Sequence, residues 1–187
     1  MKNNLLCALF VSAFFCAQTL TYAQSSKNVE KGLFKLNALS PGASYELGVG
    51  RNATFNFNTT LYPYAQEENG GGVDDFVLEL YPLVGADFRY FVNMKRRLRK
   101  GKDISRNSGN YVALENKMIL GAPLLGNIEP DNPFGYTVRV AYGIQRTYGK
   151  GFYWGLGFGV GVGAIDDDYF TTSLLSAHLG WVLTKPK

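Results

Sequence analysis

The chain has 187 residues, of which 46% are apolar and 18% are charged, so it is not a disordered chain and has enough apolar side chains for one folded domain. Its mean hydropathy lies close to zero, which excludes a bundle of transmembrane helices. Glycine (22 residues) and aromatic side chains (14%) are abundant, and a net charge of +4 is too small to indicate nucleic-acid binding by itself. This composition favours a β protein.

Residues 1–23 have the pattern of a secretory signal peptide. Lys2 precedes an apolar run over 5–17 that is too short to span a bilayer, and the segment ends in Thr-Tyr-Ala. We expect cleavage after this segment, which leaves 24–187 as a single exported domain.

Both cysteines, Cys7 and Cys16, lie in the segment that we expect to be removed. The exported domain then contains no disulfide. A lipoprotein anchored through Cys16 is one alternative, although Phe15 is bulky where such signals carry a small residue. A buried N-terminal helix is another.

Residues 29–49 hold one or two short strands. Apolar side chains such as Phe34 and Leu36 fall on even-numbered positions, whereas Tyr45 and Leu47 fall on odd-numbered ones. This change of parity occurs at Ser40-Pro41-Gly42. This change marks either a turn between two strands or a bulge within one. Single-chain bacterial barrels have an even number of strands. We therefore choose the turn.

Six further segments alternate between large apolar side chains and small or polar ones, with the period of two that a β-strand requires. They are 53–65, 76–92, 110–121, 134–148, 152–164 and 171–183. The clearest is 152–164, where apolar side chains such as Trp154 and Phe158 share one face and five glycines between Gly155 and Gly163 share the other. With the two short strands, the total is eight.

The contents of the two faces identify the kind of β protein. The polar face carries seven charged residues besides the glycines, namely Glu46, Glu79, Asp87, Arg89, Glu115, Lys117 and Arg139. Apart from Arg146, near a strand end, no charge falls on the apolar face after residue 53, and Asn116 is its most polar exception. Glycines make room inside a narrow barrel but would weaken a strand facing water, and a lipid-facing Arg or Lys at the midplane costs about 2–4 kcal/mol. The sequence therefore predicts an all-β fold, an antiparallel up-and-down transmembrane β-barrel of eight strands with paired charges in its lumen. A soluble lipocalin-like barrel and a β-sandwich are the alternatives.

The lengths of the connections orient this barrel. Connections at 48–52 and 148–151 are short, as periplasmic turns are, whereas 66–75, 122–133 and 165–170 are long enough for external loops. The external loops contain no Lys or Arg and nine acidic residues: Glu67, Glu68, Asp74, Asp75, Glu129, Asp131, Asp166, Asp167 and Asp168. We expect these loops to meet an extracellular or cell-surface partner.

The connection 93–109 carries seven of the nineteen Lys and Arg residues. It reads as a solvated periplasmic turn or as a contact for anionic lipid headgroups. A nucleic-acid partner is not expected, because the run contains no aromatic residue on which a base could stack.

Three stretches carry a resemblance to a known class. They read FKLNALSPGASYELGVGRNATFNFN at 34–58, FRYFVNMKRRLRKGKDISRNSGNYVAL at 88–114 and LLSAHLGWVL at 174–183. With the TYA-Q junction of the signal segment, they make the chain resemble small outer-membrane β-barrel proteins of Gram-negative bacteria, in the broad OmpA/OmpX-like eight-stranded class. The resemblance implies a porin-like fold and a place in the cell outer membrane, and it identifies no activity.

A catalytic site has one candidate. His178 is the single histidine, and its parity places it inward beside Ser176. A Ser–His pair also needs an orienting carboxylate, and nothing in the spacing assigns Asp87 or Glu115 to that task. We read His178 as a lumen residue and the acidic run 166–168 as a solvated loop, so we expect no catalytic residue, cofactor or metal.

The sequence thus predicts a non-enzymatic outer-membrane protein with a filled, charged lumen and a structural or surface-interaction role, in contact with outer-membrane lipid. A narrow small-solute pore is the first alternative, if the lumen glycines leave a path for water. A lipid-modifying enzyme that uses His178 is the second.

Overall fold

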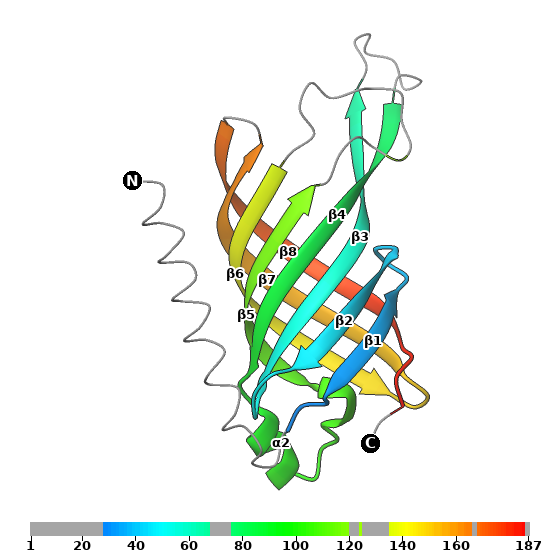
Figure 1. The fold of residues 1–187 in the computed structure, drawn as a ribbon, viewed down its shortest axis with the longest axis vertical. Helices are drawn as coiled ribbons and strands as arrows, with labels where there is room; N and C mark the ends of the chain where they lie inside the picture. The colour runs from blue at the N-terminus through cyan, green and yellow to red at the C-terminus, as the bar shows by residue number, and fades with distance from the viewer. Residues whose placement is uncertain (1–27, 68–75, 120–123, 125–134, 166–167, 186–187) are drawn as a thin grey trace, which may run out of the picture.

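The computed structural model describes residues 28–67, 76–119, 124, 135–165 and 168–185. Eight antiparallel strands follow one another around a closed barrel, in which the last strand pairs with the first (Figure 1). The strands are β1 (Gly32–Asn37), β2 (Gly42–Gly48), β3 (Ala53–Glu67), β4 (Phe76–Phe91), β5 (Gly109–Ile119), β6 (Gly135–Tyr148), β7 (Phe152–Ile165) and β8 (Asp168–Val182). The predicted eight-stranded antiparallel ring is confirmed. The predicted signal peptide lies outside the described residues and stays a prediction.

The first two strands form a short hairpin. β1 and β2 pair from Gly32↔Leu47 to Asn37↔Gly42, so the change of parity near residue 40 is a turn and not a bulge. β3 holds the tip of this hairpin, because the Leu61 amide donates to the carbonyl oxygen of Pro41. The tip ends well below the tops of β3 and β4 (Figure 1).

The unequal heights of the strands leave edges unpaired near the loop end, and two prolines lie on those edges. The Leu61 amide points toward the hairpin, so Pro63, two residues further along β3, has its nitrogen on the same side but above the hairpin tip. The β4–β5 pairing ends at Leu83↔Ile119, and by the same alternation Pro82 turns its nitrogen toward β5 just beyond that end. Neither proline interrupts a ladder, since a residue without an N–H is suited to a free edge.

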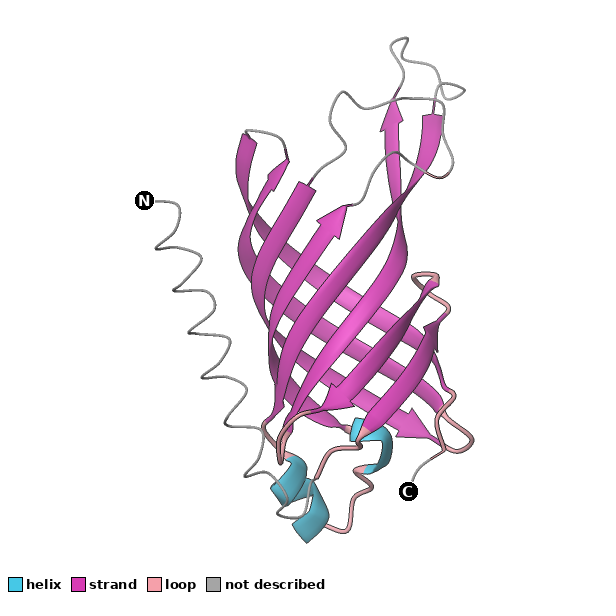
Figure 2. Ribbon diagram, viewed as in Figure 1, coloured by secondary structure: helices cyan, strands magenta, loops and turns pink. Residues whose placement is uncertain are grey.

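Two short helices close the end of the barrel at which β4 ends and β5 begins. They are α2 (Met94–Arg99) and the 3₁₀ helix η2 (Ser105–Asn107), and both lie below the strands (Figure 2). Arg106 and Asn107 have positive φ values of 50° and 58°, which turns the chain sharply back toward β5. The basic connection therefore has a fold of its own, which neither the predicted solvated turn nor the predicted contact for lipid headgroups specified.

Candidate functional site

The two faces of the barrel wall have inverted polarity. Apolar side chains stand on the outside, where Phe158 is 55% exposed and Leu179 is 38% exposed. Charged side chains stand on the inside, where Arg89 is 7% exposed and Glu115 is 9% exposed. A soluble β protein buries its apolar face instead. The inside of this barrel is therefore the candidate functional site.

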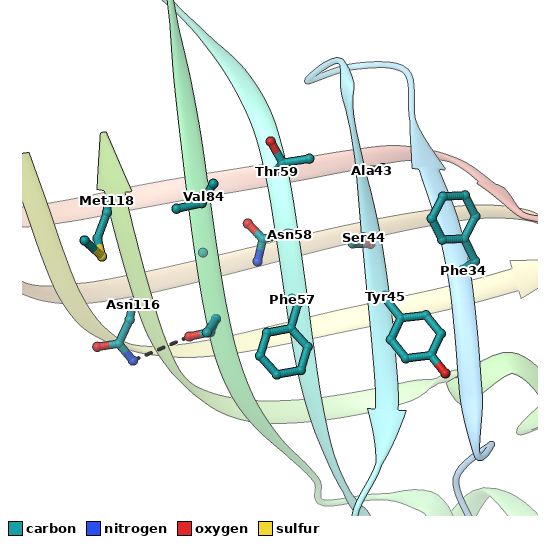
Figure 3. A pocket seen from close by; sticks show the side chains of 12 residues that line it. Phe34, Ala43, Ser44, Tyr45, Phe57, Asn58, Thr59, Val84, Asn116 and Met118 are labelled. Carbon is teal, nitrogen blue, oxygen red and sulfur yellow. Dashed lines mark hydrogen bonds between the residues drawn. The ribbon is translucent and has the colours of Figure 1, made fainter. Parts of the chain in front are cut away.

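The outer wall is apolar even where it is hollowed. A shallow groove of about 510 Å³ crosses the outside of β1 to β5, where the small side chains of Ala43, Thr59 and Val84 lie among larger apolar ones (Figure 3). The exceptional Asn116 stands on this wall, and its amide donates to the backbone carbonyl of Ala86 at 3.4 Å (Figure 3). The Asn116 side chain is thus tied to the sheet.

Three ion pairs lie in the lumen, and the sequence placed all of their residues there except Lys35. Asp87 bonds Arg89 on the same strand at 2.8 Å, and Glu115 bonds Arg139 directly opposite on β6 at 2.6 Å. Glu46 bonds Lys35, and its second carboxylate oxygen accepts a hydrogen bond from Thr54 at 2.8 Å. All six charged groups are buried within the barrel.

Arg89 and Gln145 join two of these pairs, Arg89–Asp87 and Lys35–Glu46, into one network. Besides Asp87, the Arg89 guanidinium contacts the Gln145 side-chain oxygen at 3.5 Å and lies over the Tyr111 ring at 4.9 Å from its centre. The same Gln145 oxygen accepts a hydrogen bond from Lys35 at 3.0 Å. The ring of Tyr111 in turn packs onto Gly143, where an added Cβ would collide with it. The network and this ring fill the lower part of the lumen.

Lys35 is the functional residue that the sequence reading missed. The outward parity of Phe34 and Leu36 already placed Lys35 inward, but β1 is short and its pairing was undecided. Glu79 lies on β4, where its backbone pairs with Tyr64, and its side chain lies outside the described part of the chain. Lys117 forms no hydrogen bond and no ion pair with any of the described side chains.

A folded plug closes the lower end of the lumen. Asn107 and Ser108 are buried there, and the Gln145 amide donates to the carbonyl oxygen of Asn107 at 3.3 Å. Met94 of α2 is fully buried against Phe91, Tyr111 and the N-terminal Val29. The predicted solvated turn over 93–109 is therefore wrong for these buried positions, although Lys95, Arg96, Arg99, Lys100 and Lys102 are exposed. The alternative, a contact for anionic lipid headgroups, stays a prediction.

The lumen glycines do not leave a row of empty sites. An added Cβ at Gly157 would meet the Ser176 hydroxyl at 2.8 Å, and one at Gly163 would meet the Phe170 ring at 2.6 Å. Side chains of β8 thus occupy the space that these glycines provide. Two cavities remain higher in the lumen, of about 300 and 230 Å³.

The geometry around His178 does not assemble a catalytic triad within the described residues. The Ser176 hydroxyl donates to the carbonyl oxygen of Gly157 at 3.3 Å, and Asp87 and Glu115 are engaged by arginines. His178 lines the larger lumen cavity. No group of three or more His, Cys, Asp or Glu side chains in the described chain is arranged to hold a metal ion.

Most of the acidic loop residues that the sequence predicts to form a surface lie outside the described residues. Glu67 ends β3, and Asp168 begins β8 as an exposed residue. The other seven acidic residues lie outside the described residues: Glu68, Asp74, Asp75, Glu129, Asp131, Asp166 and Asp167.

Comparison with known proteins adds no relative. No protein-family model matches the chain, and neither a curated protein nor a solved structure matches it. Among the described residues, no helix has the length and apolar character needed to cross a membrane.

Proposed function

We propose that this chain is a non-enzymatic outer-membrane β-barrel protein of the OmpA/OmpX-like class, with a structural or surface-interaction role. The observation that carries the proposal is the inverted polarity of the wall. Mid-barrel rows such as Leu114, Val140 and Val160 point outward and are exposed, while three ion pairs lie inside. An apolar surrounding would favour this arrangement, whereas water would leave a wide apolar surface exposed.

The lower half of the barrel supports a closed lumen. The Lys35–Glu46 and Arg89–Asp87 pairs lie above the plug, and Gln145 bonds both layers, accepting from Lys35 and donating to the Asn107 carbonyl. An eight-stranded barrel is just wide enough for side chains to fill it. This arrangement favours a non-conducting protein over the narrow pore. The acidic loops remain our proposed contact with a surface partner.

A charge placed on the outer wall tests the membrane location. Val140 is 57% exposed at the middle of β6, and Tyr148 is similarly exposed at its lower end. Val140→Arg should lower the free energy of unfolding from lipid vesicles by about 2–4 kcal/mol, whereas Tyr148→Arg should change it by about 1 kcal/mol or less. On a water-exposed wall, both substitutions would be nearly neutral.

The unfolding measurement is a urea titration in vesicles, read from the different gel mobilities of unheated and boiled samples. The wild-type chain should fractionate with the outer membrane and show that mobility difference. Recovery in the soluble fraction without detergent, or equal stability of the two arginine variants, would contradict the proposal.

A further inference from the structure

One cation of the described lumen residues belongs to none of the three ion pairs. The described side chains in the lumen include four cations and three anions. The cations are Lys35, Arg89, Lys117 and Arg139, and the anions are Glu46, Asp87 and Glu115. Each anion is bonded to one cation, so the positive charge of Lys117 is unmatched. A half-buried charge without a counter-ion is costly, and a bound anion would offset that cost.

The position of Lys117 leaves room for such an anion. Lys117 lines two cavities of the lumen, whereas the space beside Gly85, its partner across the sheet, is occupied by the Asn58 amide. Glu79 lies six residues further along the same strand, which is about 20 Å away at the usual rise of a β-strand. Glu79 is therefore too distant to serve as the partner of Lys117.

Two cavities of different character meet at Lys117. The lower one, of about 300 Å³, has mixed walls whose polar residues include Asn56, Asp87 and His178. Two buried oxygens in these walls, Asn56 Oδ1 and Asp87 Oδ1, have no hydrogen-bond partner. The upper cavity, of about 230 Å³, is lined largely by apolar side chains such as Ile119 and Phe170. Leu83, Lys117 and Leu174 line both cavities, so the two cavities adjoin at these side chains.

The lower cavity also reaches the outer wall. β8 pairs with β1 only from Gly180 downward among the described residues, because the β1–β2 hairpin is short. The cavity is lined by Ser40 at the hairpin tip and by Leu175 and Ala177, which lie on the outward-facing side of β8. It therefore passes around the free edge of β8, through what we call the side gap, the opening above residue 40 between β3 and β8. Leu175 is 74% exposed beside this opening, so the side gap begins within the apolar outer wall.

We propose that the lumen binds a single-chain amphiphile with one negative charge, such as a long-chain carboxylic acid. The carboxylate pairs with Lys117, and donors on its hydration shell satisfy the free oxygens of Asn56 and Asp87. The hydrocarbon chain lies against Leu83, Phe170 and Leu174 in the upper cavity. A singly charged head matches the single surplus charge, whereas a phosphate monoester would bring nearly two charges. The entry route through the side gap rests on the proposed membrane location, but the site itself does not.

The test uses cis-parinaric acid, a fluorescent long-chain carboxylic acid, and the full-length protein in nanodiscs of zwitterionic lipid. Empty nanodiscs are subtracted. Lys117→Gln should weaken binding at least about tenfold, as loss of a charge-assisted hydrogen bond requires, and Lys117→Arg should restore most of it. Lys150→Gln, at an exposed lysine in the β6–β7 turn, should bind as the wild type does. The methyl ester of the probe should bind the wild type as weakly as the acid binds Lys117→Gln.

A second pair of variants tests the apolar chamber independently of Lys117. Leu174→Trp places a larger side chain where the two cavities join, and it should abolish binding. Leu179→Trp, on the outward face of the same strand and outside the lining of both cavities, should leave binding unchanged. The gel-mobility difference checks that each variant is folded.

Equal binding by wild type and Lys117→Gln, tight binding of the ester, or binding unaffected by Leu174→Trp would each overturn the proposal. If the protein purifies from the soluble fraction, the same titration is done in buffer. Binding there with the same dependence on Lys117 would refute the membrane location and support the site, whereas loss of binding by a membrane-inserted protein would refute the site alone.

Discussion

Glu46 shows how this barrel accommodates ionised groups in its interior. Its side chain is fully buried, and it accepts hydrogen bonds from the Lys35 ammonium and the Thr54 hydroxyl. Lys35 is equally buried and also donates to Gln145. Removing one member of such a pair leaves the other charge uncompensated, which is far more costly than removing both.

We therefore expect opposite outcomes from single and double substitutions at this pair. Lys35→Met should lower the free energy of unfolding by about 3–5 kcal/mol, because Glu46 keeps only the Thr54 hydroxyl. Lys35→Met combined with Glu46→Leu should recover most of that loss, since both charges are then gone. Urea titration in vesicles measures the free energy of unfolding of the wild type, the single variant and the double variant, with the exposed Lys150→Met as the control. A double variant no more stable than the single one would show that the pair does not act as a unit.

The sequence predicted which residues turn inward more reliably than which residues pair. Parity alone placed Asp87, Arg89, Glu115 and Arg139 inside, because side chains alternate strictly along a strand. The choice of partners depends on register, which sets Glu115 opposite Arg139 but also opposite Asp87 on its other side. Register follows from strand lengths and turns, and one residue of slip would change every partner.

At the scale of elements, the connection from β4 to β5 differs most from its prediction. It lacks the hydrophobic periodicity by which a helix is recognised, and its charge indicated exposure. Its fold depends on a few contacts that are distant in sequence, among them the Glu30 amide donating to Asn107 Oδ1 at 2.8 Å. Such contacts form only after the strands bring residues 28–31 and 105–108 to the same end of the barrel.

Asn107 should control the stability of this plug. Its φ of 58° lies in the left-handed region, which asparagine and glycine tolerate better than alanine. Asn107→Gly and Asn107→Ala both remove the hydrogen bond to Glu30. Alanine also adds backbone strain of about 1 kcal/mol, so the plug should open about five times more often in Asn107→Ala than in Asn107→Gly. Trypsin cleavage at the exposed Lys and Arg residues of 95–102 measures this opening. Equal cleavage of the two variants would exclude the strain as a cause.

At the scale of the whole molecule, strand number and wall polarity were predictable, whereas strand height was not. The alternation in 152–164 and the even-strand rule gave the ring without any knowledge of its contacts. The side gap arises because β1 and β2 have 6 and 7 residues while β3 and β4 have 15 and 16. The β2–β3 pairing ends at Gly42↔Thr60, whereas β3 and β4 stay paired as far as Glu67↔Phe76, and only the register reveals this difference.

The same architecture predicts the electrical behaviour of the barrel. The plug and the Arg89 network are two successive barriers below the cavities, so an ion entering from the loop end finds a closed floor. Purified protein in planar bilayers should therefore give no stepwise conductance, with a general porin at the same protein load as the positive control. Deleting 95–105 should leave the bilayers silent, because the Lys35–Glu46 and Arg89–Asp87 pairs still fill the lumen above the deletion. Steps seen only in the deletion variant would mean that the plug alone closes the barrel, and steps in the wild type would favour the narrow pore instead.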